Sequence, residues 1–258
     1  MIQNKLQDIY NNLKSNASEE IKVINKCIND LEKTLLSDDF SPDQEKELLA
    51  FMFSEKMLPL FQRSYEVFET KLEIEFANKI ISINANSQQE FKTYLLYKRF
   101  VGLIQNEIKL ADITSQDKIL FIGSGPIPIT AILLHKLSGC EVDCCEKIEE
   151  SAVLSKKVIE KLGYGNYINV INKEGAKVNY SDYTVVLIAL LAKPKDLLLK
   201  ETWDSVKKGV RIICRTSNLV RQAFYETTNE SLFNIYQPQG KVLAKADQTI
   251  SSVLLIKS

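Results

Sequence analysis

A short apolar run that ends directly in two glycines limits the fold of this chain more than any other feature. Residues 118–122 are predicted to be a buried strand, Gly123-Ser124-Gly125 a turn, and residues 129–137 a helix. This order is typical of the first strand–helix unit of a doubly wound sheet, where nucleotides bind beyond the carboxyl ends of the strands. Because glycine has no Cβ, a ligand can approach such a turn closely.

The turn does not match the common phosphate-binding motifs. A dinucleotide fingerprint has a third glycine at the position that Pro128 occupies here. A Walker A loop needs Gly-Lys-Ser/Thr, which does not follow. The turn therefore suits a ligand that lies along it without a pyrophosphate.

The rest of the C-terminal half continues the alternation of strands and helices. We predict strands at 141–145, 168–171, 184–189 and 210–214, with helices at 151–162 and 196–206. This alternation indicates a parallel sheet. Two last strands, 240–244 and 252–256, are joined by a short link and are expected to pair antiparallel at the sheet edge.

Residues 1–112 have the apolar spacing of helices instead. Helices are predicted at 19–36, 42–56, 65–83 and 91–110, with Ser41 as the N-cap before Pro42. We therefore expect an N-terminal helical domain over 1–112 and an α/β domain over 113–258.

The charge balance excludes several classes of partner. With 33 basic and 33 acidic side chains, the chain lacks the cationic surplus that coating nucleic acid or anionic lipid requires. No apolar run approaches the ~20 residues of a membrane span, and the N-terminus has no signal-peptide core. We expect a soluble, cytoplasmic protein without a nucleic-acid or membrane partner, and the oligomeric state is left open, a homodimer included.

The shortage of histidine limits the chemistry. A single histidine, His135, rules out Ser-His-Asp and Cys-His catalysis and, with five cysteines that form no CxxC pair, argues against a metal site. We expect His135 to pack, the cysteines to be buried thiols, and no metal to be bound. A general base would then be a carboxylate or a tyrosine.

A carboxylate at the second strand end points to the ligand. Glu146 follows the glycine turn by about 20 residues, where an acid accepts hydrogen bonds from a ribose diol. Glu174, Gly175 and Ala176 follow the third strand, where they either edge an adenine ring or form a plain loop. Turn and carboxylate together predict an S-adenosylmethionine (SAM) site in a class I methyltransferase-like, Rossmann-like α/β fold.

One stretch is more specific. Residues 123–130 read GSGPIPIT, which resembles the GSGPLPLT signature of nicotianamine synthases and their bacterial and archaeal relatives. Residues 185–191 and 212–225 resemble later segments of that family in the same order. The resemblance covers about residues 60–226 and implies a helical N-terminal domain beside a SAM-binding domain.

The resemblance also implies the reaction. These enzymes transfer the aminocarboxypropyl (2-aminobutanoyl) arm of SAM to an amine and release 5′-methylthioadenosine. The product is nicotianamine or a related opine-type metallophore precursor, and the acceptor is a small molecule of the amino-acid class, such as histidine, glutamate or SAM-derived aminobutyrate. In addition to the strand-end residues above, SAM contacts are expected from the turn and the fourth strand end: Gly123, Ser124, Gly125, Pro126, Ile127 and Ala189.

Catalytic and acceptor residues follow from the same resemblance. Glu73, in the segment ETKLEIEF, matches the family's catalytic acid, with Glu69 and Glu75 as rivals. Tyr97 matches a second catalytic residue. The acceptor side is expected to include Tyr94, Glu107 and Arg215. Arg215 either holds a substrate carboxylate bidentately or pairs with an acid structurally.

Three alternatives stay open. Ordinary methyl transfer to a small molecule would release S-adenosylhomocysteine. Cyclisation of SAM to azetidine-2-carboxylate would give methylthioadenosine without an acceptor. A non-catalytic SAM-fold protein would act as a binding module. The by-product distinguishes these alternatives.

Overall fold

The computed structural model describes residues 2–15, 21–36 and 40–257. Contacts divide the chain into two compact units. The first holds Met1–Lys71, Thr216–Thr227 and Leu243–Ser251, and the second holds Leu72–Arg215, Thr228–Val242 and Ser252–Ser258. The units follow contacts rather than chain order, so the linear boundary predicted after residue 112 stays a prediction.

The first unit is helical, as expected for this part of the chain. Its elements are α1 (Ile2–Ser15), α2 (Ile21–Leu35), α3 (Pro42–Ser54), the first half of α4 (Leu58–Ser82) and the 3₁₀ segment η2 (Leu219–Ala223). The predicted cap of α3 is confirmed: Ser41 Oγ accepts from the Gln44 N–H, and the Gln44 side chain accepts from the Ser41 N–H. This reciprocal capping box satisfies two donors at the start of the helix.

Buried polar contacts join the three segments of the first unit. Arg221 donates to the Glu45 carboxylate at 3.1 Å and to two carbonyls of the 243–251 segment. The Tyr225 hydroxyl donates to Glu69 at 2.6 Å. Because an unpaired buried charge is costly, these contacts hold the segments to one another.

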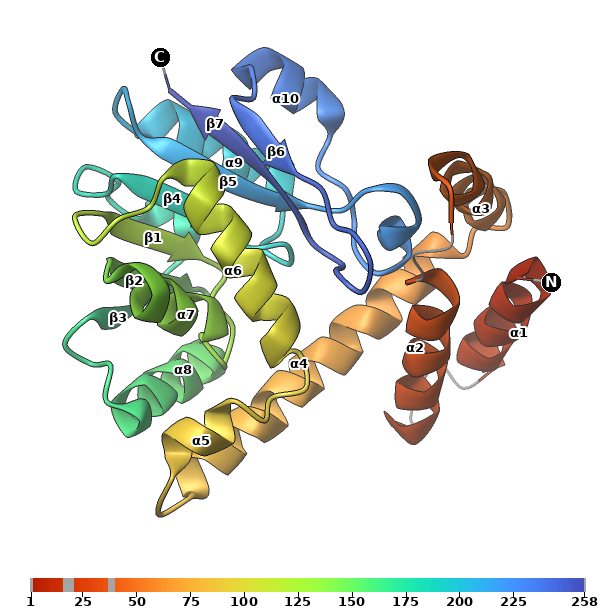
Figure 1. The fold of residues 1–258 in the computed structure, drawn as a ribbon, viewed down its shortest axis with the longest axis horizontal. Helices are drawn as coiled ribbons and strands as arrows, with labels where there is room; N and C mark the ends of the chain where they lie inside the picture. Colours follow the sequence, from red (N-terminus) through yellow and green to blue (C-terminus); the bar gives the residue numbers. More distant parts are fainter. Residues whose placement is uncertain (1, 16–20, 37–39, 258) are drawn as a thin grey trace. The chain divides into compact units, whose positions relative to one another are not determined.

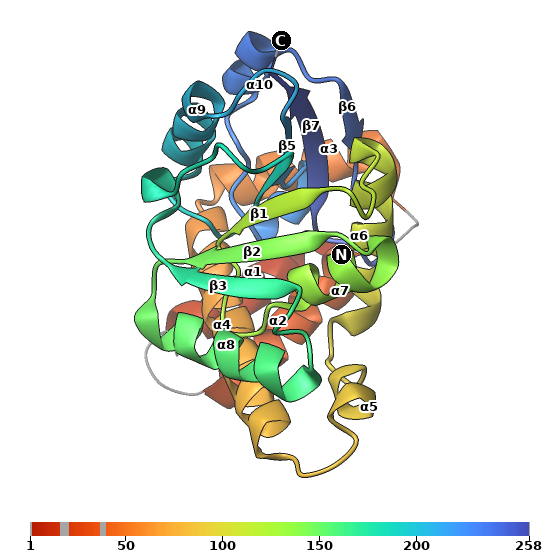
Figure 2. The ribbon, with the colours of Figure 1, turned by 90° about the vertical axis from the view of Figure 1, so that its left-hand side faces the viewer.

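The second unit contains the predicted doubly wound sheet, whose strands lie in the order β3-β2-β1-β4-β5-β7-β6. The strands are β1 (Lys118–Ile122), β2 (Glu141–Glu146), β3 (Ile168–Asn172), β4 (Val185–Ile188), β5 (Arg211–Thr216), β6 (Gly240–Val242) and β7 (Ser251–Ile256). Strands β1 to β5 pair parallel, whereas β6 and β7 pair antiparallel, which confirms the predicted edge pair. Figure 2 shows β1, β2 and β3 side by side.

Helices cover both faces of this sheet. They are α5 (Ser87–Phe91), α6 (Tyr97–Ala111), α7 (Ile129–Ser138), α8 (Glu149–Leu162), α9 (Lys195–Ser205) and α10 (Glu230–Tyr236), with the 3₁₀ segment η1 (Gly175–Lys177). Figure 1 shows α6 in front of the strands and α9 behind them. Trp203 of α9 stacks on Tyr236 of α10, with ring centroids 4.5 Å apart.

The single helix predicted over 91–110 is wrong. The chain leaves the helix after Phe91 and starts α6 at Tyr97. Tyr94 and Leu96 are both buried while Leu95 is 66% exposed. Residues two apart point to opposite sides of a helix, so the chain has to turn in order to bury both.

The thiols and the histidine behave as predicted. All five cysteines are buried and free of disulfides, and burial raises the pKa of the Cys144 and Cys145 thiols. His135 lies at the end of α7, with Nδ1 2.8 Å from the Cys140 carbonyl and its ring stacked on Tyr167. These are packing contacts.

The described residues hold neither a metal-binding cluster nor a helix suited to a membrane. Within 2–15, 21–36 and 40–257, no three His, Cys, Asp or Glu side chains gather so that they could hold a metal ion. In the same ranges no helix combines the length and the apolar character that crossing a membrane needs.

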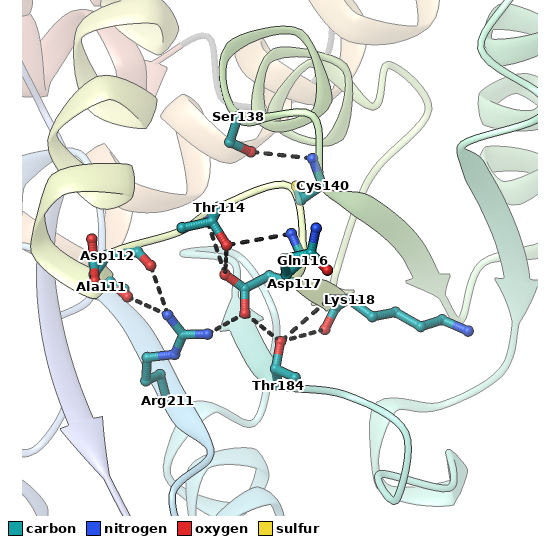
Figure 3. A network of polar contacts seen from close by, with 10 residues as sticks. All are labelled: Ala111, Asp112, Thr114, Gln116, Asp117, Lys118, Ser138, Cys140, Thr184 and Arg211. Carbon is teal, nitrogen blue, oxygen red and sulfur yellow. Dashed lines mark hydrogen bonds and ion pairs between the residues drawn. The ribbon is translucent and has the colours of Figure 1, made fainter.

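At the amino-terminal end of the strands, Asp117 is the centre of a polar network (Figure 3). Its carboxylate pairs with Arg211 and accepts from Thr184 Oγ1 at 2.7 Å and the Thr114 N–H at 2.8 Å. Arg211 also donates to the Ala111 carbonyl at 2.7 Å. Burial raises the pKa of Asp117, but these hydrogen bonds and the Arg211 charge outweigh it, so the pKa lies below its ordinary value.

Replacing Asp117 by Asn should lower the free energy of unfolding at neutral pH by about 2 kcal/mol, because Arg211 loses its charged partner. The depressed pKa means that the ionised Asp117 stabilises the fold above the unfolded value of about 4, and that this stabilisation is lost as pH falls further. Urea unfolding between pH 7 and pH 3 should therefore show a shallower acid-side decline for the variant.

Asp43→Asn is the matched control, since Asp43 pairs with Lys46 on the surface with 87% of its side chain exposed. This control should leave stability unchanged. Equal effects of the two substitutions would contradict the role given to Asp117.

Candidate active site

The carboxyl ends of four parallel strands meet at one edge of the sheet. The register pairs Ile122 of β1 with Cys145 of β2 and Ile188 of β4, and it pairs Glu146 of β2 with Asn172 of β3. The glycine turn, Glu146, residues 174–176 and Ala189 therefore follow neighbouring strand ends. In a doubly wound sheet this edge is where ligands bind.

The turn needs its glycines. Gly123 and Gly125 have φ of +81° and +68°, which side-chain-bearing residues rarely adopt. An ideal Cβ on Gly123 would lie 3.0 Å from the Cβ of Ala192 and 3.3 Å from that of Ala189. The Gly123 N–H donates to the Cys145 carbonyl at 2.8 Å. The turn is therefore held against the segment that follows β4.

The remaining turn residues lead into α7. Ser124, Pro126 and Ile127 are all buried. Helix α7 begins at Ile129, so its first N–H groups follow directly after the turn. The positive end of a helix dipole favours a negatively charged ligand group there.

Glu146 holds the turn. The residue is 6% exposed, and its two carboxylate oxygens accept from the N–H groups of Gly125 and Ile148, each at 2.9 Å. A carboxylate oxygen has two acceptor sites, so each oxygen retains capacity for a hydroxyl donor. Glu146 can therefore still accept the predicted hydrogen bonds from a ribose diol.

Glu73, on the second half of α4, reaches the same turn. An ideal Cβ on Gly125 would lie only 2.7 Å from Glu73 Oε2. The Glu75 side chain is exposed, and Glu69 belongs to the first unit, where it accepts from Tyr225. Among the three acids considered, Glu73 is the one whose contact with the glycine turn is shown.

The two tyrosines lie at the break between α5 and α6. Tyr97 is half-buried, with its ring centroid 5.9 Å from that of Phe91, and burial with the nearby Tyr164 raises its pKa. Tyr97 therefore stays protonated at neutral pH and can donate a hydrogen bond. Tyr94 is buried, with its ring 5.0 Å from Phe76 of α4. Their roles in a reaction stay predictions.

Arg215 pairs with an acid inside the second unit. Its Nε and one terminal nitrogen each donate to Glu107 at 2.9 Å, the other terminal nitrogen donates to Thr130 at 3.1 Å, and its guanidinium lies 5.6 Å from the Phe121 ring centroid. Ser252 donates to Glu107 at 2.7 Å. The structure thus shows the structural pairing that the sequence left as one of two options.

Gly175 lies close to the end of β1, whereas Glu174 is exposed. Glu174 is exposed and pairs with Lys177 at 2.9 Å, and this contact lowers the pKa of the Glu174 carboxyl. Gly175 starts η1, and a Cβ there would lie 2.7 Å from Ile122 Cγ2. Ala176 is the middle residue of η1.

Lys195 was missed by the sequence reasoning. Its ammonium donates to the carbonyls of Ala189 and Arg215, so it joins the ends of β4 and β5. Lys195 starts α9 directly after Pro194. The sequence shows only a lysine at the start of a helix that follows a strand. This pattern is too common in proteins to identify a functional residue.

Known proteins resemble this chain in sequence and in fold. The family model described as "Nicotianamine synthase protein" matches residues 1–258. An L-histidine 2-aminobutanoyltransferase of Yersinia pestis is 27% identical over 123 residues, which are 47% of this chain and 45% of the relative. The chain thus matches about half the length of this curated relative.

Solved structures match over nearly the whole chain. A glutamate-to-glutamine mutant of MtNAS in complex with S-adenosylmethionine superposes with a TM-score of 0.90 at 26% identity, covering 99% of this chain and 97% of that chain. MtNAS in complex with MTA and tNA gives a TM-score of 0.91 with the same identity and coverage. The predicted fold class is confirmed by these matches and by the strand order.

Replacing Glu107 by Gln should lower the free energy of unfolding by about 3–5 kcal/mol, because the buried Arg215 would lose its counter-charge. Urea unfolding measures the loss. Glu141→Gln is the control, since Glu141 is exposed at the start of β2, and it should have no measurable effect. If the Glu107 variant loses less than about 1 kcal/mol of unfolding free energy, the Arg215–Glu107 ion pair does not stabilise the fold appreciably.

Proposed function

The chain belongs to the nicotianamine synthase family, and from this membership we propose that it is an enzyme that uses SAM to transfer a 2-aminobutanoyl group to an amino-acid acceptor. The observation that carries the proposal is the Glu73 carboxylate against Gly125 of the glycine turn. This contact supports the assignment of a base beside the expected donor site.

The strand-end edge fits SAM. The glycine turn follows directly on β1 at the carboxyl ends of the strands, and Glu146 retains acceptor capacity for a ribose diol. We assign donor binding to this turn, Glu146, residues 174–176 and Ala189. When bound, SAM supplies an aminocarboxypropyl carbon whose C–S bond breaks as the acceptor nitrogen bonds to it, with the electron pair staying on sulfur and 5′-methylthioadenosine leaving.

The chain's own residues supply the proton transfer. An amine attacks only when it is neutral, so a base has to take its proton. We assign this role to Glu73. Tyr97, which stays protonated, is assigned a hydrogen bond that orients the reacting groups.

The acceptor is an amino acid in this proposal. L-Histidine is the first candidate because the curated relative carries that substrate in its name. We assign Tyr94 to the acceptor side, whereas Glu107 and Arg215 support that side through their buried ion pair. The buried thiols fit a reducing, cytoplasmic compartment.

The reaction is tested by incubating the purified protein with SAM and each amino acid and identifying products by mass spectrometry. We expect methylthioadenosine together with an aminobutanoyl adduct of one acceptor. S-Adenosylhomocysteine instead would establish methyl transfer. Methylthioadenosine with azetidine-2-carboxylate and no adduct would establish cyclisation. SAM binding without any product would favour a binding module.

Glu73→Gln should slow aminobutanoyl transfer by on the order of 10²–10⁴-fold, because the variant loses the general base. SAM affinity, measured by calorimetry, should be retained. Glu75→Gln is the matched control on the same helix, and its exposed side chain predicts normal turnover. Normal turnover in the Glu73 variant would remove Glu73 from the mechanism.

A further inference from the structure

We propose that Gly125 is a positioning residue for Glu73. Because residue 125 has no side chain, the Glu73 carboxylate can lie in the space that a side chain would fill. This inference rests on the proposed role of Glu73 as the base. The absence of a side chain at Gly125 thus makes room for the Glu73 carboxylate of α4 as well as for any ligand in the turn.

The contact is specific to one side chain. The three heavy atoms nearest to an ideal Cβ on Gly125 all belong to Glu73: Oε2 at 2.7 Å, Cδ at 3.6 Å and Oε1 at 3.9 Å. Non-bonded heavy atoms are most favourable at about 3.5–4.0 Å, so the shortest of these contacts is repulsive. Any side chain at residue 125 has to displace either the carboxylate or the turn.

The turn is held in place from its other sides. The Gly125 N–H donates to Glu146, and the Gly123 N–H donates to the Cys145 carbonyl. Gly123 itself packs against Ala192. Moving the turn would break these contacts, whereas the end of a glutamate moves by rotation about its side-chain bonds. A methyl group at residue 125 therefore displaces Glu73.

Such a displacement affects catalysis more than folding. A misplacement of about 1 Å can slow a reaction by roughly 10²-fold when geometry is critical. The hydrogen bonds that hold the turn are kept, so the variant should remain folded. The expected signature is a loss in kcat with little change in SAM affinity.

A competing explanation is backbone conformation alone, because Gly125 has φ of +68°. Gly163 separates the two effects. It ends α8 with φ of +79°, and nothing lies within 4 Å of its ideal Cβ. Gly163→Ala therefore reports the cost of left-handed backbone without the contact.

The kinetic test compares Gly125→Ala, Gly163→Ala, Glu73→Asp and the double variant Gly125→Ala/Glu73→Asp. We expect Gly125→Ala to lose kcat by on the order of 10–100-fold with SAM affinity within about threefold. Gly163→Ala should keep wild-type kcat with a similar shift in melting temperature. Shortening residue 73 should slow the wild type but speed the Gly125→Ala enzyme, because aspartate leaves room for the methyl group.

A second readout needs no activity. With ¹³C-labelled glutamate and Glu73→Gln for assignment, NMR follows the pH titration of the Glu73 carboxyl in the ligand-free protein. Its pKa or chemical shift should change in Gly125→Ala and not in Gly163→Ala. If the wild type yields no methylthioadenosine, the proposed function fails, and this titration still decides the positioning role.

The proposal is overturned by an unchanged Glu73 titration in Gly125→Ala. It is equally overturned by wild-type kcat in that variant, or by a loss of SAM affinity above about tenfold that the aspartate at residue 73 does not relieve. The last result would mean that the glycine serves the donor alone.

Discussion

The buried pair of Arg215 and Glu107 joins more elements of the second unit than any other polar contact described above. It links β5 to α6, and its further partners Thr130 and Ser252 bring in α7 and β7. Neither charge can be left alone in this environment, since desolvation of an unpaired ion is costly. The helix that begins at Tyr97 is thereby tied to the sheet whose strand ends carry the glycine turn.

The same unit contains a second point of convergence, at Gly125. One carboxylate, from Glu146, receives its N–H, and another, from Glu73, lies where a Cβ would be. Glu146 of β2 accepts a hydrogen bond from the Gly125 N–H. Glu73 of α4 instead occupies the space that a side chain at residue 125 would need.

Local patterns predicted local structure well. The bounds of β1 follow from an apolar run ended by glycine and were predicted as the structure has them. The helix predicted over 19–36 from its 3–4 spacing ends at Leu35, and its first two residues lie outside the described residues. The break before Tyr97 was not, because it depends on which side chains are buried by tertiary packing. The pairing of Arg215 with Glu107, 108 residues apart, has no local signal. The role of Glu73 was predicted from the family resemblance. Its contact with Gly125 could not be predicted, because it depends on how α4 packs against the glycine turn.

The division of the chain into interleaved segments has a consequence for its synthesis. Residues 2–15 of the first unit are synthesised before the rest of the described residues, yet the unit also needs Thr216–Thr227 and Leu243–Ser251. Its buried partners, such as Glu45 and Arg221, are 176 residues apart in the chain. Contacts of such high sequence separation form slowly. The helices of the first unit therefore complete their packing only after Leu243–Ser251 has been synthesised. Until then the apolar surface that these later segments cover is exposed, which favours aggregation.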